Sequence, residues 1–502
     1  MSKDVIAGFD AGTSRFRCNL FNLNGNHLFE ASETTPLKKK DDGFYYNPAE
    51  EIYKISLNII KKIVKHANNN NLRIKSISFS SIGESGIPID INGNILMDCI
   101  PWYDQRTEII KNKLRYKIND DFIYKNTGLT NDHFYSAYKI LWIKKYKPLI
   151  YKKIFKWLPI NDYLAWRFTG EISTDASQAM RTMLFDPRKL NWSDKMIKKI
   201  RLDQDILPKI VNAGDRKGLI KKEIKRKLSL GYNCMVGTGG HDDFVGTFAI
   251  NGFKNNMAIN SMGSAEAIII NTKKFYTKKI LNKSKFISGV FKTRNKKNYY
   301  VVASILTSSA VIEWYKRLLQ INNLDKLNIN LKNSEGVKKN IFVFPQFEFS
   351  HTPINEKYSN GAILGIKLDS KKEDIYKSIL ECLSFDTKNA IDFASKFTKS
   401  KIKKILCFGG AVNNKEWLKI RSNILKQNLF VVNNVENVSL GSAILGGLAA
   451  KVYKNENEAF LKIRLKETKI VKNIKESKIY VNIFKTKYLS ILKQIIELNR
   501  IR

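Results

Sequence analysis

The sequence of 502 residues is poor in cysteine, proline and acidic side chains. Its five cysteines are scattered, without a Cys-x-x-Cys pair or a metal-ligand spacing, which favours buried thiols in a reducing compartment over disulfides or a zinc site. No apolar run is long enough to span a bilayer, and the N-terminal MSKDVIAGFDAGTS lacks the apolar segment of a signal peptide. These absences lead us to expect a cytoplasmic protein with no membrane partner.

The shortage of acidic residues leaves a large positive charge. There are 87 lysines and arginines against 46 acidic residues, and the formal net charge is +41. Such a charge is typical of proteins that bind nucleic acid or anionic surfaces. The basic residues are mostly lysines spread along the whole chain, however, as in KKKDDG and RNKKNYY, and no nucleic-acid-binding motif accompanies them. We therefore interpret them as solvated surface and expect no nucleic-acid partner, although a positive field can speed the arrival of an anionic nucleotide.

A chain of this length favours two or three domains. Two segments share the pattern of a strand, a glycine turn and a returning strand: residues 5–23 around Gly12-Thr13-Ser14, and residues 257–271 around Gly263-Ser264. The backbone N–H groups and hydroxyls at such a tip can cradle a phosphate, and Asp10 beside the first tip could hold Mg²⁺. The repeat suggests two similar domains with a phosphate-binding hairpin each. An ordinary hairpin is the alternative for either turn alone.

Residues 236–246, VGTGGHDDFVG, place two adjacent carboxylates where an apolar strand ends in a glycine turn. The glycines let the backbone turn tightly and approach a ligand closely, and the small and apolar residues that follow predict a packed helix. A carboxylate at a strand-to-helix turn can accept a proton or hold a metal. The alternative is an acidic first turn that stabilises its own helix dipole. The local sequence leaves both interpretations of Asp242 and Asp243 open.

A third group of residues has the chemistry of a sugar or polyol site. Glu84 lies in the polar loop 80–86, and Trp102, Asp104 and Arg106 follow within IPWYDQR. Aromatic faces suit the C–H surfaces of a sugar, and charged groups bind its hydroxyls. An ordinary helix N-terminus with an aspartate cap explains Asp104 almost as well.

Taken together, these motifs resemble those of the FGGY carbohydrate kinases, which include glycerol kinase and xylulokinase. The resemblance runs from about Val5 to Ala450. Its most specific part is GAILGI at 361–366 followed by DIYKSILE at 374–381, which is similar to the family's C-terminal signature, and FYSAYKILW at 134–142 is similar to the other signature. The remaining matches are to the first phosphate motif, the second phosphate motif and the adenosine motif, at Asp10–Ser14, Gly263-Ser264 and Gly409-Gly410-Ala411.

The resemblance implies an α/β fold of two actin-like, ribonuclease-H-like domains with a cleft between them. The N-terminal domain, 1–250, would bind the sugar and carry the catalytic aspartate, and the C-terminal domain, 251–502, would bind the nucleotide. The implied cofactors are ATP and Mg²⁺, and the implied reaction is phosphoryl transfer to a hydroxyl of a small-molecule sugar or polyol. The resemblance also allows a homodimer. Phosphoryl transfer is mainly positioning and charge neutralisation, so one carboxylate that orients and deprotonates the attacking hydroxyl is sufficient.

The residue patterns and the resemblance together predict the site. The family's general base aligns with Asp242, although two adjacent carboxylates can share a proton. The predicted substrate-binding residues are Glu84, Trp102, Asp104, Arg106, Tyr135 and Asp243. The predicted metal ligands are Asp10 and Asp242. The predicted nucleotide-binding residues are Gly12, Thr13, Ser14, Arg15, Gly263, Ser264, Gly409, Gly410, Ala411 and Asn414.

Departures from the family limit the substrate. Where glycerol kinases carry an Arg-Glu pair, this chain has Gly83-Glu84, and the tyrosine expected two residues before Ser136 is Phe134. The Gln-x-His-Gly of xylulokinases is absent at 81–86. We therefore expect a ketose, a pentitol or a similar acceptor rather than glycerol. The alternative function is a non-catalytic sugar or nucleotide sensor or scaffold that keeps the fold, and the intact acidic residues and glycine turns argue against it.

Overall fold

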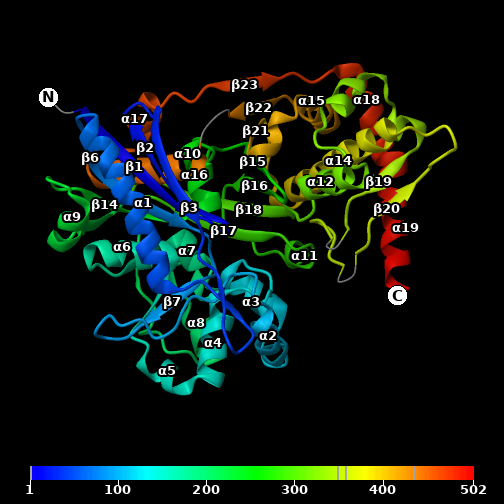
Figure 1. The fold of residues 1–502 in the computed structure, drawn as a ribbon. Helices are drawn as coiled ribbons and strands as arrows, with labels where there is room; N and C mark the ends of the chain where they lie inside the picture. The colour runs from blue at the N-terminus through cyan, green and yellow to red at the C-terminus, as the bar shows by residue number, and fades with distance from the viewer. Residues whose placement is uncertain (1–2, 348–349, 357–358, 433–435, 502) are drawn as a thin grey trace. The chain divides into compact units, whose positions relative to one another are not determined.

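The computed structural model describes residues 3–347, 350–356, 359–432 and 436–501 (Figure 1). By compactness the chain divides into two units. The first comprises Met1–Phe253, Gly289–Tyr299 and Asn434–Leu465, and the second comprises Lys254–Ser288, Tyr300–Asn433 and Lys466–Arg502. The domain bounds predicted from the sequence, 1–250 and 251–502, stay a prediction. Within the described ranges, no helix combines the length and the apolar character needed to cross a membrane.

The first unit is built on a six-stranded sheet in the order β13-β14-β6-β1-β2-β3. β1 and β2 form an antiparallel hairpin, which confirms the hairpin predicted at 5–23, whereas β1, β6 and β14 run parallel. These parallel strands are mostly buried, and β6 and β14 carry small residues such as serine and glycine among the apolar ones. Their carboxyl ends meet at one edge of the sheet. The strands are β1 (Lys3–Ala11), β2 (Arg15–Asn22), β3 (His27–Thr34), β6 (Leu72–Ser81), β13 (Arg216–Leu219) and β14 (Met235–His241).

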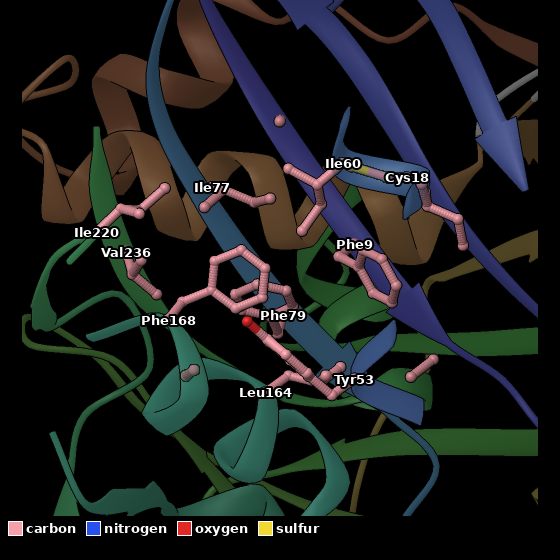
Figure 2. Packing of buried hydrophobic residues seen from close by; sticks show 14 of the residues in the cluster. Phe9, Cys18, Tyr53, Ile60, Ile77, Phe79, Leu164, Phe168, Ile220 and Val236 are labelled. Carbon is pink, nitrogen blue, oxygen red and sulfur yellow. The ribbon is translucent and has the colours of Figure 1, made fainter. Parts of the chain in front are cut away.

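Helices cover both faces of this sheet. α1 (Ala49–Asn69) and α6 (Ile160–Thr169) pack on the face that carries Phe9. α16 (Asn437–Ala449) packs on β1, β6 and β14 from the other face. Successive residues of a strand face opposite sides of the sheet, so Gly8, the neighbour of Phe9, faces this helix. A Cβ at Gly8 would lie 1.7 Å from a backbone oxygen of α16, so only glycine allows the contact. Figure 2 shows part of the core beneath α1 and α6, including Phe9, Ile60, Ile77, Phe79, Leu164 and Phe168.

A second sheet of seven strands belongs mainly to the second unit, in the order β17-β18-β16-β15-β21-β22-β23. β15 and β16 form an antiparallel hairpin, and β21 lies parallel to β15 on its other side. This is the arrangement of β2, β1 and β6 in the first sheet, so the predicted repeat of strand, glycine turn and strand is confirmed. The strands are β15 (Met257–Met262), β16 (Glu266–Thr272), β17 (Ile287–Lys292), β18 (Lys297–Ile305), β21 (Lys404–Phe408), β22 (Leu429–Val432) and β23 (Glu467–Ile470).

A buried carboxyl group lies on the 27-residue helix α14 (Lys372–Thr398) of the second unit. Glu381 accepts hydrogen bonds from the backbone N–H of Val337 at 2.9 Å and from the hydroxyl of Tyr480 at 2.7 Å. Burial raises the pKa of Glu381 to about 7. At a pH between the ordinary pKa of a glutamate and this value, the folded protein keeps a proton that the unfolded chain has released. The stability of the fold should therefore fall as pH rises through that window.

We predict that Glu381→Gln removes this pH dependence. For the wild type, the free energy of unfolding should fall by up to about 3 kcal/mol between pH of about 4.5 and about 7 through this group alone. The glutamine keeps the shape, and its amide can donate to the hydroxyl of Tyr480. The measurement is urea unfolding of both proteins across this pH range. If the two stability curves run parallel, Glu381 does not titrate as described.

Candidate active site

Segments at the carboxyl ends of three parallel strands gather at one edge of the first sheet. β1 carries Asp10 and leads into the turn Gly12–Arg15, β6 leads into Gly83-Glu84, and β14 leads through His241 into Asp242. In sheets with parallel strands, this edge is where ligands bind. The topology therefore brings the phosphate-type turn, part of the sugar-type loop and the paired aspartates to one place in the first unit.

A cavity of about 230 Å³ lies between these segments, and all of its lining residues belong to the first unit. Four of the residues predicted to act on or bind the substrate line it, namely Glu84, Trp102, Asp242 and Asp243. Thr13 of the phosphate-type turn lines the same cavity. The complete lining is Thr13, Ile82, Gly83, Glu84, Trp102, Phe134, Arg181, His241, Asp242 and Asp243.

The turn between β1 and β2 is closed by a hydrogen bond from the backbone N–H of Gly12 to the oxygen of Arg15 at 3.2 Å. Thr13, Ser14 and Arg15 are exposed at its tip. The hydroxyl of Thr13 accepts a hydrogen bond from the indole Nε1 of Trp102 at 3.1 Å. This bond links the phosphate-type turn to the aromatic wall of the cavity, so a group bound at one would lie beside the other.

Asp10, the next-to-last residue of β1, carries a carboxyl group in an unusual environment. Its Oδ1 is buried without a hydrogen-bond partner, and the closest recorded cation is Arg17, whose Nε lies 3.8 Å from Oδ2. Burial and the negative charge of Asp242 raise the pKa of Asp10 to about 8. A divalent cation would supply the missing partner of Oδ1 and would offset the repulsion between the two aspartates. The residues present therefore fit a Mg²⁺ ion, which prefers carboxylate oxygen and phosphate ligands.

The helix α10 (Asp242–Ala249) begins directly at the end of β14, with His241 as its cap. The Nδ1 of His241 lies 2.9 Å from Oδ1 of Asp242 and 3.3 Å from the backbone N of Asp243. Burial alone would lower the pKa of His241, but the charge and hydrogen bond of Asp242 outweigh burial and raise it. The pair starts a helix and also lines the cavity, so the two interpretations of it are compatible.

Asp243 holds its proton more tightly than an ordinary aspartate. Desolvation by the surrounding protein and the charge of Asp242 raise the pKa of Asp243 to about 6. The side chain is accessible from the cavity. Its position next to Asp242 suits a carboxyl group that hydrogen-bonds a substrate hydroxyl.

The glycines before His241 allow close packing, and their predicted approach to a ligand stays a prediction. A Cβ at Gly239 would lie 1.9 Å from the backbone oxygen of Phe79 on β6. A Cβ at Gly240 would lie 2.6 Å from the hydroxyl of Ser177 on the short helix α7 (Ala176–Met180). That hydroxyl accepts a hydrogen bond from the backbone N–H of His241 at 2.9 Å. The glycines therefore fix the position from which α10 starts.

Arg181, at the end of α7, is a cavity residue that sequence reasoning missed. Its guanidinium pairs with the carboxylate of Glu84, 97 residues away in the chain. A Cβ at Gly83 would lie 2.7 Å from Cγ of Arg181 and 2.6 Å from Cδ2 of His241. Position 83 is a glycine because these two side chains occupy its space. The guanidinium that is absent at position 83 thus reaches Glu84 from a different part of the chain.

Three residues predicted to bind the substrate lie outside the cavity lining. Asp104 and Arg106 form a largely buried ion pair, with Nε 2.7 Å from Oδ1, and the guanidinium also stacks on aromatic rings. The carboxylate of Asp104 accepts a hydrogen bond from the backbone N–H of Arg106, so Asp104 caps the short helix at 105–107, as the alternative interpretation predicted. Tyr135 is fully buried, with Arg181 5.3 Å from its ring centre. The structure therefore places these three residues outside the lining, and their predicted contact with a substrate stays a prediction.

The other predicted nucleotide-binding residues lie in the second unit. Gly263-Ser264 joins β15 to β16, Gly409–Ala411 follows β21, and Asn414 caps the helix α15 (Lys415–Leu425). Gly409 has a φ of +100°, and a Cβ there would lie 2.4 Å from the backbone oxygen of Met262. Only glycine fits this contact between the two loops. Both loops expose glycine or serine backbone, which leaves room for a flat or anionic group.

Comparisons with known proteins agree with this arrangement. Residues 5–249 match the model of the FGGY family of carbohydrate kinases, N-terminal domain, and residues 258–450 match its C-terminal domain. The chain is 23% identical over 488 residues to a xylulose kinase from Staphylococcus xylosus, which covers 96% of this chain and 99% of that protein. Its fold is similar to that of a gluconate kinase from Lactobacillus acidophilus, with a TM-score of 0.89, 20% identity and 99% of both chains covered. It is also similar to Plasmodium falciparum glycerol kinase with ADP, with a TM-score of 0.89, 23% identity and 97% and 98% of the two chains covered.

Proposed function

Because the chain belongs to the FGGY family of carbohydrate kinases, we propose that it transfers a phosphoryl group from ATP to a hydroxyl of a small neutral ketose or polyol, with Asp242 as the general base. Members of this family are phosphotransferases with an alcohol group as acceptor. The observation that supports the finer proposal is the cavity in which Asp242 and Asp243 face the Glu84–Arg181 pair beside Thr13. It combines a base, a hydroxyl-binding ion pair and a phosphate-type turn.

In the proposed reaction, this chain's own residues mainly position and deprotonate the acceptor. The carboxylate of Glu84 and the guanidinium of Arg181 hold neighbouring hydroxyls, and the aromatic wall of Trp102 and Phe134 contacts the C–H surface. Asp242 accepts the proton of the attacking hydroxyl, while His241 holds its carboxylate in place. General base catalysis of this kind contributes about 10²–10⁴-fold to the rate.

The cofactors follow from the same residues. Kinases of this family use ATP, and we propose that the turn at 12–15 and the loops at Gly263 and Gly409 bind it. We also propose Asp10 and Asp242 as ligands of Mg²⁺, supported by the unpartnered Oδ1 of Asp10. When bound, the ion neutralises the charge of the phosphate groups.

The charges of the cavity favour a neutral acceptor over a sugar acid. Its two cations are already engaged, since Arg181 pairs with Glu84 and His241 pairs with Asp242. Asp243 adds a third carboxyl group, so the described lining holds no cation that an acidic substrate could use. The volume of about 230 Å³ lies below the roughly 300–1,000 Å³ typical of drug-sized ligands, which suits a monosaccharide or a shorter polyol.

A substrate panel tests the proposed function. Purified protein with ATP and Mg²⁺ should release ADP with a pentulose, hexulose or pentitol, with kcat/KM at least about 100-fold above that for gluconate, because a buried uncompensated charge costs several kcal/mol. Glycerol belongs in the panel as the small neutral control. Release of ADP with gluconate but with no neutral sugar would overturn the neutral-substrate proposal, and no release with any acceptor would support the sensor alternative.

We predict that Arg181→Gln raises KM for the acceptor by about 10–100-fold, since it removes charged hydrogen bonds and leaves Glu84 without its partner. KM for ATP should change by less than about threefold, because the loops at Gly263 and Gly409 are in the other unit. Arg181→Lys keeps the charge but loses the planar guanidinium, so its KM for the acceptor should lie between that of the wild type and that of Arg181→Gln. Steady-state kinetics in both substrates provides the measurement. Equal changes in both KM values would indicate a general structural defect instead.

A further inference from the structure

A second and larger cavity lies in the first unit and shares no lining residue with the candidate active site. Its volume is about 740 Å³. It lies where α2 (Glu108–Arg115), α4 (Ser136–Tyr146) and α8 (Asp194–Ile200) end. Figure 1 shows these three helices in the lower part of the view. We call it the basic groove. It is lined by Ile110, Lys113, Leu114, Lys117, Leu141, Lys144, Lys145, Lys198, Lys199, Ile200 and Arg201.

The basic groove concentrates positive charge without compensation. Six lysines and one arginine line it, and no carboxylate is among its described lining residues. None of the seven cations has a recorded ion pair within the described part of the chain, and Lys144 instead donates to the backbone oxygen of Arg201. Acidic residues of the same helices lie in their first turns, where Glu108 pairs with Lys111 and Asp194 with Lys189. The described lining of the groove therefore offers no carboxylate to offset these cations.

Two of these cations contact each other. The side chain of Lys113 lies close to that of Lys145, and the positive charge of Lys145 lowers the pKa of Lys113. Two ammonium groups side by side repel each other unless one loses its proton or an anion lies between them. An anion bound beside this pair would relieve the repulsion.

Helix dipoles do not account for this much charge. Basic residues in the last turn commonly offset the negative end of a helix, which is equivalent to about half an elementary charge. Three helices end at the groove, so their dipoles account for roughly 1.5 charges in total. Seven cations line it. Most of the positive charge must therefore be balanced by ions from solution or by a ligand.

We propose that the basic groove binds a small polyanion, of nucleotide size or smaller, that carries two or more phosphate groups. The volume lies in the range of small-molecule sites, and Ile110, Leu114, Leu141 and Ile200 give it an apolar floor between the cations. A single-stranded nucleic acid is less suited, because no aromatic side chain lines the groove for base stacking. A membrane surface is less suited too, because the cations surround a hollow.

The test uses inorganic triphosphate as the probe and isothermal titration calorimetry of the full chain, without Mg²⁺ and with saturating ADP to occupy the nucleotide site. Lys113→Gln/Lys145→Gln should weaken triphosphate binding by at least about tenfold, because two adjacent charges are removed. The matched control is Lys61→Gln/Lys65→Gln, which removes two exposed lysines that lie one helical turn apart on α1, away from the groove lining. It should change the affinity by less than about twofold. Orthophosphate should bind the wild type much more weakly than triphosphate.

Equal weakening in the two double variants would overturn the proposal, since it would show a response to net charge alone. The proposal also fails if orthophosphate binds as tightly as triphosphate. Parallel titrations with a duplex DNA oligonucleotide and with phosphatidylserine vesicles test the other possible occupants. If Lys113→Gln/Lys145→Gln abolishes binding of the DNA or of the vesicles but leaves triphosphate binding unchanged, the groove binds nucleic acid or membrane instead, and the proposal fails. Turnover with the preferred sugar should be the same in both double variants, which separates this proposal from the proposed function.

Discussion

Asp242→Asn should lower kcat by about 10³-fold or more while changing the affinity for ADP by less than about twofold. Asparagine has nearly the same shape and can keep the contact with His241, but it cannot accept the proton of the attacking hydroxyl. The proposed nucleotide loops of the second unit are not altered by this change. Single-turnover phosphate transfer and equilibrium ADP binding measure the two quantities separately.

Asp243→Asn is the matched control for this prediction. The neighbouring carboxyl group should act through hydrogen bonding to the acceptor, so its loss should raise KM and lower kcat by no more than about tenfold. Both variants carry the same change in charge at the start of α10. A larger loss of kcat in Asp243→Asn than in Asp242→Asn would reverse the assignment of the base.

Arg421→Met should lower the free energy of unfolding by about 3–5 kcal/mol, because it leaves a buried carboxylate without its partner. Arg421 is fully buried on α15 and donates to Glu266 at 2.6 and 2.8 Å and to Asn260 at 2.6 Å. Burial would raise the pKa of Glu266, but the guanidinium outweighs burial and lowers it. Glu266 follows the Gly263-Ser264 turn, so this ion pair also holds a proposed phosphate loop in place.

The double variant Arg421→Met/Glu266→Gln provides the control. It removes both charges, so it should recover at least about half of the stability lost in the single variant. Urea unfolding measures all four members of the cycle, and ADP binding of the folded variants reports on the loop. A loss below about 1 kcal/mol in Arg421→Met would show that the ion pair is not a main support of this unit.

Local chemistry explains which parts of the fold could be predicted. The apolar run at 5–9, the glycine turn at 12–14 and the returning strand at 16–22 depend on residues close in sequence, and they fold as the predicted hairpin. The same holds for the hairpin around Gly263-Ser264 and for the strand-to-helix turn at Asp242. The order of these motifs then indicated two similar α/β units, as found.

Contacts between distant segments explain what the sequence did not reveal. Gly83 looked like the loss of an arginine, but Arg181 supplies the guanidinium from the end of α7. The glycine at position 239 suggested a close approach to a ligand, and the structure adds that its missing side chain leaves room for the backbone of β6. Asp104 and Arg106 have the right chemistry for a sugar site, yet they satisfy each other. In each case the decisive partner is known only once the chain is folded.

The basic residues are a further case: the sequence shows how many there are but not where they lie on the folded surface. Spread along the chain, the basic residues indicated a solvated surface. The fold brings seven of them around one groove without a recorded carboxylate partner among the described residues. Charge alone did not distinguish these lysines from the others, because their clustering arises from three helices that end at the same place.

Phosphorus NMR of the wild type with ATP, Mg²⁺ and the best neutral acceptor of the panel is the decisive measurement of the proposed phosphoryl transfer. We expect a new phosphate monoester signal that grows in step with ADP and is nearly absent with Asp242→Asn. Formation of ADP and inorganic phosphate without a sugar ester, or an ester signal that persists at the wild-type rate in Asp242→Asn, would contradict the proposed function.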